Sequence, residues 1–245
     1  MYPVQTYLQP SVLKELGMQY FDGWAANFGE TVTSMELSPS GQGYRAKTRF
    51  SKFTNLPELL TLYRSFADVQ TGETVKLDVP TTDRKVIALT PSEEVIRLSE
   101  EIAERAERIS GGRVDPSVDN MLKITSDGKK LALDPRLYAP EASEAGDNKL
   151  NECAKRIFET WADTAEIKGT QIVFCDMSTP KKRFEDYEHG KDFDVYNELK
   201  YKLVARGIPA DEVAYIHDAK NDQEKQALFD RVNDGDVRVL IGSTA

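Results

Sequence analysis

Apolar and polar positions alternate along the last part of the chain in a way that predicts helices and strands in turn. Leu150, Ala154 and Ile157 recur at helical spacing, and residues 172–175 form a continuous apolar run, typical of a strand buried on both faces. Further helices are expected over residues 193–206 and 221–233, and further strands over residues 213–217 and 237–241. Strands that alternate with helices of this length predict an α/β fold with a parallel sheet and right-handed crossovers.

The first part of the chain is predicted to be mostly helical. Apolar residues spaced three or four apart predict two short helices within residues 7–30, separated at Gly17, and another helix over residues 56–69. Between these helices, residues 31–37 are expected to form a strand and residues 38–43 a turn.

Residues 74–89 are expected to contain two short strands around Pro80, the stronger of them at residues 86–89. Thr90-Pro-Ser-Glu93 has the form of a capping box with proline at the first helical position, and it predicts a helix to about Ile109. Oppositely charged residues four apart on this helix are expected to form a solvated face. These pairs are Glu93–Arg97, Glu101–Arg105 and Glu104–Arg108.

These patterns divide the chain into three parts. Residues 1–112 are mostly helical, residues 113–147 are interpreted as a connector with a turn at 126–129, and residues 148–245 carry the alternating pattern.

A basic and aromatic segment lies at residues 44–53. Arg45, Lys47, Arg49 and Lys52 alternate there with three aromatic residues. Such interleaving is found in surfaces that bind nucleic acid. In an acidic chain it also fits a local salt-bridging face, and both interpretations remain open.

Composition narrows the class of protein. The 245 residues are 40% hydrophobic and 30% charged, with a net charge of −9 that argues against wholesale nucleic-acid binding by charge alone. A local basic groove is still compatible with that charge.

No apolar stretch approaches the ~20 residues of a membrane span, and Met1-Tyr-Pro-Val does not open a signal peptide, so we expect a cytoplasmic protein without membrane contact. The only cysteines, Cys153 and Cys175, make a disulfide scaffold or a structural zinc site improbable.

The candidate chemistry lies where the predicted strands end. Parallel strands place the segments 176–179, 217–220 and 242–244 at the same edge of the sheet, where ligands bind in open α/β folds. Ser178, Thr179, Ser243 and Thr244 could contact phosphates there through hydroxyl and backbone N–H groups. The alternative is that these side chains only cap the following helices.

Other chemistries are less well supported. The sequence has no dinucleotide-binding glycine motif, no P-loop and no nucleophile elbow. Cys175 is expected to pack in the core. His217 is expected to position a ligand or contact backbone, because Asp218 points to the other face of a strand and cannot orient it as a general base.

Residues 172–176, 216–219, 221–233 and 237–244 resemble the second RecA-like lobe of superfamily-two helicases. The nearest type is the large helicases of phages and mobile elements, often fused to adenine-specific DNA methyltransferases. The upstream part resembles Swi/Snf-type proteins, with the tail of the first lobe leading into the second. Matched by position, residues 174–177 correspond to motif IV and residues 242–244 to the start of motif V, while His217-Asp218 matches an element near the nucleic-acid backbone.

The resemblance implies a P-loop NTPase-type lobe that contacts the DNA phosphate backbone without sequence specificity and works with the first helicase lobe of the same chain. It assigns nucleic-acid contacts to Asp176, Ser178, Thr179, His217, Asp218, Ser243 and Thr244, and nucleotide contacts to Gly242 and Thr244. ATP and Mg²⁺ are expected in the parent protein. The P-loop, the acidic box and the arginine finger are missing from these residues, so this chain alone is expected to bind no cofactor and to hydrolyse no ATP.

Two further expectations accompany this interpretation. The chain ends directly after an apolar strand, which suggests a fragment of a longer protein whose incomplete sheet exposes residues 237–241 as an edge. The rival hypothesis is a non-enzymatic Rossmann-like module of a mobile-element protein that binds a nucleotide or a partner protein. DNA methylation as the main activity of the parent is a third possibility.

Overall fold

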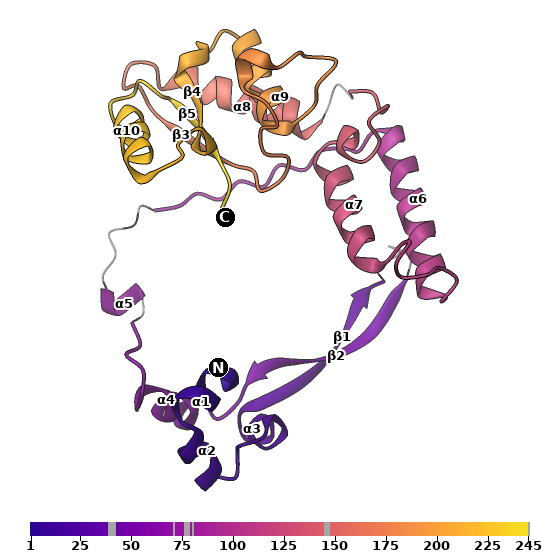
Figure 1. The fold of residues 1–245 in the computed structure, drawn as a ribbon, viewed down its shortest axis with the longest axis vertical. Coiled ribbons are helices and arrows are strands. Elements are labelled where there is room, and N and C mark those ends of the chain that lie inside the picture. Colours follow the sequence, from indigo (N-terminus) through magenta and orange to yellow (C-terminus); the bar gives the residue numbers. More distant parts are fainter. Residues whose placement is uncertain (39–42, 71, 76–78, 80, 145–147, 245) are drawn as a thin grey trace. The chain divides into compact units, whose positions relative to one another are not determined.

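The computed structural model describes residues 1–38, 43–70, 72–75, 79, 81–144 and 148–244. The chain forms two compact units, Met1–Val86 and Ile87–Ala245, and each is described by itself (Figure 1).

The first unit begins with three short helices around an aromatic core. These are α1 (Tyr2–Leu8), α2 (Pro10–Glu15) and α3 (Phe21–Phe28), and α4 (Leu56–Arg64) joins them after a hairpin. The expected helical pattern and the break at Gly17, which has a φ of +70°, are confirmed, with α1 as an additional helix. Leu13, Met18, Trp24, Phe28 and Leu59 are buried together, and Trp24 Nε1 donates to Gln5 Oε1 at 2.8 Å.

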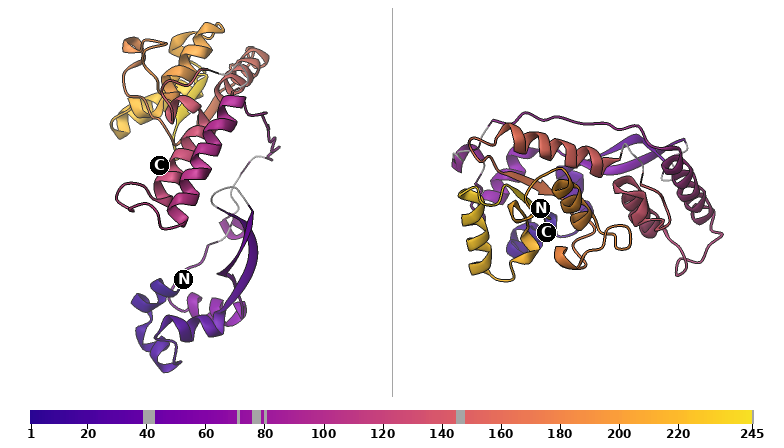
Figure 2. Two further views of the ribbon diagram at one scale, coloured as in Figure 1. Left: turned by 90° about the vertical axis from the view of Figure 1, so that its right-hand side faces the viewer. Right: turned by 90° about the horizontal axis from the view of Figure 1, so that it is seen from above.

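A long antiparallel hairpin connects α3 to α4. It consists of β1 (Gly29–Leu37), which confirms the predicted strand, and β2 (Tyr44–Phe53), which sequence analysis did not assign (Figure 2). The predicted turn falls mainly on residues 39–42, which lie outside the described residues. At its base, Ser38 N donates to Gly43 O at 2.9 Å.

The strand predicted at residues 86–89 is wrong. Residues 81–92 have no regular secondary structure, and the short helix α5 (Gly72–Val75) lies where the first of the two strands was expected to begin. An apolar run becomes a strand only when a neighbour completes its hydrogen bonds. None of the described strands pairs with residues 86–89.

The second unit begins with two packed helices, α6 (Glu93–Ser110) and α7 (Met121–Leu133), followed by the short helix η1 (Pro135–Leu137). They share a core of seven buried residues: Leu98, Ile102, Ala106, Ile124, Leu131, Ala139 and Ala142. The turn expected at residues 126–129 is therefore wrong, because α7 runs through it and gains the burial of Ile124 and Leu131.

The start and the charges of α6 differ in detail from the prediction. Ser92, not Thr90, is the N-cap, and its Oγ accepts from Val95 N at 3.3 Å. Arg105 does not pair with Glu101 on its own helix. It forms ion pairs with Asp119 at 2.9 Å and Asp127 at 3.0 Å, because these carboxylates face it from the segment that packs against α6.

The remaining chain confirms the predicted alternation and the parallel sheet. Its elements are α8 (Lys149–Asp163), β3 (Gln171–Phe174), α9 (Val195–Ala205), β4 (Val213–Tyr215), α10 (Asp222–Asn233) and β5 (Val239–Gly242), with the 3-10 helices η2 (Phe184–Asp186), η3 (Ala210–Glu212) and η4 (Ile216–Asp218) in the connections. The strand order is β3-β5-β4, and all pairs are parallel.

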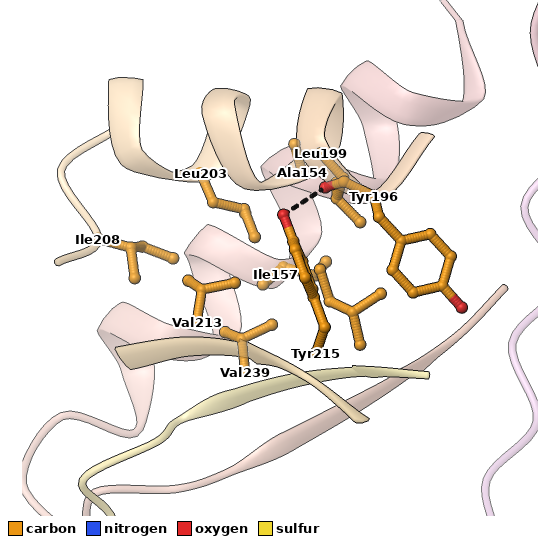
Figure 3. Packing of buried hydrophobic residues seen from close by; sticks show 10 residues of the cluster. Ala154, Ile157, Tyr196, Leu199, Leu203, Ile208, Val213, Tyr215 and Val239 are labelled. Carbon is orange, nitrogen blue, oxygen red and sulfur yellow. Dashed lines mark hydrogen bonds between the residues drawn. The ribbon is translucent and has the colours of Figure 1, made fainter. Parts of the chain in front are cut away.

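Alternate residues of the central strand β5 enter two different cores. Val239 and Ile241 pack under α8 and α9, where Tyr215 Oη also donates to the carbonyl of Tyr196 at 3.2 Å (Figure 3). Leu240 packs on the opposite face with Leu228 of α10. Helices therefore lie on both faces of the sheet at its central strand, as the alternation predicts.

Two predictions about strand burial are wrong. β3 is an edge strand whose Ile172 and Phe174 side chains are 60% and 66% exposed, so it is not buried on both faces. β5, which was expected to form an exposed edge, lies in the middle of the sheet and is buried throughout. The order of strands, which decides both points, is not encoded in the apolar pattern of any single strand.

Candidate functional site at the ends of the parallel strands

The structure brings the ends of all three parallel strands to one edge of the sheet. We call residues 176–179, 217–218 and 242–244 at this edge the strand-end rim. Asp176 follows β3, and its Oδ1 accepts hydrogen bonds from the backbone N–H of Thr244 at 2.7 Å and from the hydroxyl of Thr244 at 2.8 Å. These bonds join the ends of β3 and β5 directly.

His217 is connected to the same edge through Tyr196, which lies in the first turn of α9. The Tyr196 hydroxyl donates to the carbonyl of Cys175 at 2.6 Å and lies 3.4 Å from Nε2 of His217. Burial and the nearby Cys175 and Asp176 raise the pKa of Tyr196 to about 12. The phenol therefore stays protonated at neutral pH and holds His217 beside the end of β3. Sequence analysis missed Tyr196 because its apolar ring marked it as a core residue.

Ser178 has a local structural contact. Its Oγ accepts from the N–H of Val195 at 3.1 Å, at the start of α9, and its φ is +57°. Ser178 thus accepts from the first N–H of the following helix, although the N-cap of α9 is Asp194, whose Oδ1 accepts from Asn197 N at 2.8 Å.

The other predicted contact residues lie along the same edge. Thr179, His217, Asp218 and Thr244 are exposed, while Ser243 is half-buried. Gly242 is buried at the end of β5, and its carbonyl accepts from the N–H of Cys175 at 2.8 Å. A Cβ at Gly242 would lie 2.9 Å from Cγ2 of Ile216, so the close packing of η4 requires glycine there.

The electrostatics of the strand-end rim are acidic. The hydrogen bonds from the backbone and hydroxyl of Thr244 lower the pKa of Asp176, so this carboxylate is ionised near neutral pH. Because Thr244 already donates both of these hydrogens to Asp176, it offers neither to a phosphate in this arrangement. The nearby thiol of Cys175 donates to the carbonyl of Met177 at 3.2 Å, and burial raises its pKa, which makes it a poor nucleophile.

The groups that would bind a nucleotide or a metal ion at the strand-end rim are engaged with neighbouring residues or, among the described residues, are not grouped together. Gly242 and Thr244, the predicted nucleotide contacts, are occupied by Ile216 and Asp176 respectively. In the described part of the chain, no three His, Cys, Asp or Glu side chains are grouped so that they could hold a metal ion. As placed, the backbone N–H and the hydroxyl of Thr244 are therefore engaged with Asp176 and not with a nucleotide. No helix among the described residues is long and apolar enough to cross a membrane.

The basic segment predicted as a second candidate forms strand β2. Arg49 makes an ion pair of 2.6 Å with Glu36 on β1, as the salt-bridging interpretation expected for that residue. Among the described residues, Arg45, Lys47 and Lys52 form no ion pair within 4.0 Å. The salt-bridging interpretation therefore accounts for one of the four cations.

The comparison with protein families supports a helicase relationship in the first unit. Residues 1–71 match a family model described as a probable helicase domain. The match spans α1 to α4 and includes the hairpin, and it does not reach the parallel sheet. Neither the curated proteins nor the solved structures gave a match to the chain.

Proposed function

We propose that this chain is part of an ATP-dependent DNA helicase or translocase of superfamily two, and that it contributes surfaces that contact the nucleic-acid backbone. The observation that carries the proposal is the match of residues 1–71 to a probable helicase domain. The parallel sheet flanked by helices is compatible with a RecA-like second lobe, which is the finer assignment that the sequence resemblance suggests.

The proposed role of this chain is binding and positioning of nucleic acid. Phosphoryl transfer needs a phosphate-cradling loop, Mg²⁺ and a charge-stabilising arginine together. The sequence has no P-loop, and Gly242 and Thr244 are engaged by their neighbours. ATP hydrolysis is therefore assigned to other residues of the parent protein, including a first helicase lobe. Swi/Snf-type organisation, a phage or mobile-element source and an attached DNA methyltransferase belong to the same proposal.

At the strand-end rim, Thr179 and His217 are the residues best placed to contact a phosphate. Both are exposed, and neither gives its side chain to the Asp176–Thr244 contact. Backbone contacts of this kind would hold one strand without reading its sequence. Asp218 beside them limits the anion affinity of the rim, so we expect each contact to be weak.

Fluorescence anisotropy with labelled single-stranded DNA, duplex DNA and RNA tests the proposal. We expect micromolar or weaker binding, with affinity falling steeply between about 50 and about 200 mM salt. The double variant Thr179→Ala/His217→Ala should bind nucleic acid more weakly than the wild type. Thr160→Ala changes a residue on α8 away from the rim and should leave the affinity unchanged. Failure of the chain to bind any of the three nucleic acids would refute the proposed function.

The acidity of the rim favours one other function, a Rossmann-like module that binds a partner protein or a nucleotide without catalysis. A carboxylate already bonded to Thr244 suits a basic peptide better than a phosphate. Retention of the chain by a lysine-rich peptide, dependent on Asp176 and Asp218 and without any binding of nucleic acid, would support this alternative.

A further inference from the structure

The two faces of the β1–β2 hairpin differ in chemistry. Arg45, Lys47 and Arg49 occupy alternate positions of β2, opposite Glu36, Ser34 and Val32 of β1. Because side chains alternate between the faces of a strand, these three cations project from one face. We call them the hairpin basic face.

The opposite face carries no charge over the same stretch. Leu37 lies opposite Tyr44, Met35 opposite Ala46 and Thr33 opposite Thr48. The hydroxyls of Thr33 and Thr48 are 2.7 Å apart, which places both side chains on this face. The segregation of charge therefore follows from the register of the hairpin.

The charge on the hairpin basic face has an excess of one sign. Three cations face a single carboxylate, Glu36, which is paired with Arg49 at 2.6 Å. Beyond the register shift, Glu30 lies opposite Lys52 and these two charges balance. A positive surplus on an exposed surface is unusual in a chain of net charge −9, and it implies attraction for an anionic partner.

The shape of the hairpin adds a second argument. Every residue of β2 is exposed, and the strand contacts the core of its unit at its end, where Phe50 and Phe53 lie against Trp24. Alternate residues of an antiparallel strand are about 6.8 Å apart, which spreads the three cations over about 14 Å. A two-stranded ribbon has the dimensions that the major groove of a DNA duplex admits, about 12 Å wide.

We propose that the hairpin basic face is a nucleic-acid-binding surface in its own right, with Arg45 and Lys47 contacting phosphates. The proposal rests on the helicase-related function above and adds a second contact surface to it, in the other compact unit. Arg49 is mainly engaged with Glu36 and contributes less. A protein partner on the uncharged face is the competing use of the hairpin.

The test uses the full chain and two double variants of equal charge change. Arg45→Gln/Lys47→Gln removes two cations of the hairpin basic face, and Arg97→Gln/Lys155→Gln removes two exposed cations from helices of the second unit. Binding of labelled duplex and single-stranded DNA is measured between about 50 and about 200 mM salt. Circular dichroism verifies that each variant is folded.

We expect the hairpin variant to bind roughly tenfold more weakly, and the slope of log affinity against log salt to fall by about 2, one for each lost phosphate contact. The control variant should change neither by more than about twofold. The charge-preserving variant Arg45→Lys/Lys47→Arg should bind with the affinity and the salt slope of the wild type, because both positive charges remain.

Two results would overturn the inference. If the hairpin variant binds like wild type while Thr179→Ala/His217→Ala weakens binding, the helicase-related function stands and the hairpin has no part in it. If both double variants weaken binding equally, the effect is one of net charge alone. Absence of binding by the unmodified chain would instead refute the proposed function itself.

Discussion

Oδ1 of Asp176 accepts hydrogen bonds from both the backbone N–H and the hydroxyl of Thr244, which follows β5 in a chain position 68 residues away. This carboxylate is thus bonded to the donors that the sequence assigns to a phosphate. The contact orders the ends of β3 and β5, and it also places a negative charge where an anionic ligand would have to approach.

The first prediction concerns this contact. Asp176→Ala frees both donors of Thr244 and removes a negative charge, so we expect single-stranded DNA to bind several-fold more tightly by anisotropy. Asp163→Ala removes an exposed carboxylate from the end of α8 and serves as the matched control. If Asp176→Ala/Thr244→Ala keeps the gain, the hydroxyl of Thr244 is not the phosphate contact, because alanine keeps the backbone N–H and loses only the hydroxyl.

The second prediction concerns Glu198, the buried carboxylate of α9. Only 1% of its side chain is exposed. It accepts hydrogen bonds from Tyr187 Oη at 2.6 Å, and Lys202 and Arg136 lie at 3.1 and 3.3 Å. Burial acts to raise the pKa of Glu198, but the bonds from Tyr187, Lys202 and His189 outweigh it and lower the pKa to about 2.

A lowered carboxylate pKa stabilises the folded state at pH values above the ordinary pKa of 4.5, and this contribution is lost as pH falls from 4.5 toward 2. Glu198→Gln removes a carboxylate that Lys202 and Arg136 share, although Lys202 keeps Glu144 and Arg136 keeps Asp134, so we expect a loss of about 1–3 kcal/mol at about pH 7. Urea unfolding at about pH 7 and about pH 3 should show a smaller pH dependence in this variant than in Glu159→Gln, an exposed control. Equal pH dependence in the two variants would show that Glu198 is not the responsible carboxylate.

The third prediction uses two neighbours on one face of the sheet. Ile172 of β3 lies opposite Leu240 of β5, yet Ile172 is 60% exposed and Leu240 is 6% exposed, because α10 packs over β5 and leaves β3 uncovered. We expect Leu240→Ala to lower the free energy of unfolding by about 2–5 kcal/mol. Ile172→Ala should cost no more than about 0.5 kcal/mol by the same urea titration. Equal losses would mean that β3 is covered in solution.

This contrast also shows what the sequence can predict about the fold. Helix starts are local: the helix expected from residue 221 begins there, with Asn221 as its N-cap, whose Oδ1 accepts from Glu224 N at 2.9 Å. The alternation of helices and strands is local too. Strand order is not local. Residues 172–175 were therefore predicted to be buried on both faces and residues 237–241 to form an exposed edge, although the structure has the reverse. For the same reason residues 86–89 were predicted as a strand, although no strand pairs with them among the described residues.

For the candidate site, the parallel topology predicted that the strand ends meet, and Asp176 and Thr244 do so. The pairing of a carboxylate with the expected phosphate donors could not be predicted, because it depends on side-chain directions across 68 residues of chain. Tyr196 was not identified for a similar reason. Its ring belongs to the core, while its hydroxyl reaches Cys175 and lies near His217.

The fourth prediction concerns the unit that matches the helicase family. Leu59 of α4 is fully buried in one cluster with Trp24 and Phe28, whereas Leu8 at the end of α1 is 59% exposed. The chain has two tryptophans, so a Trp161→Phe background makes Trp24 the sole tryptophan reporter of this core. Leu59→Ala should lower the free energy of unfolding by about 2–5 kcal/mol, since it removes contacts and leaves a cavity beside the indole. Leu8→Ala should change it by no more than about 0.5 kcal/mol. Urea unfolding followed by Trp24 fluorescence measures both changes. A cost for Leu8→Ala as large as that for Leu59→Ala would show that Leu8 is buried in solution.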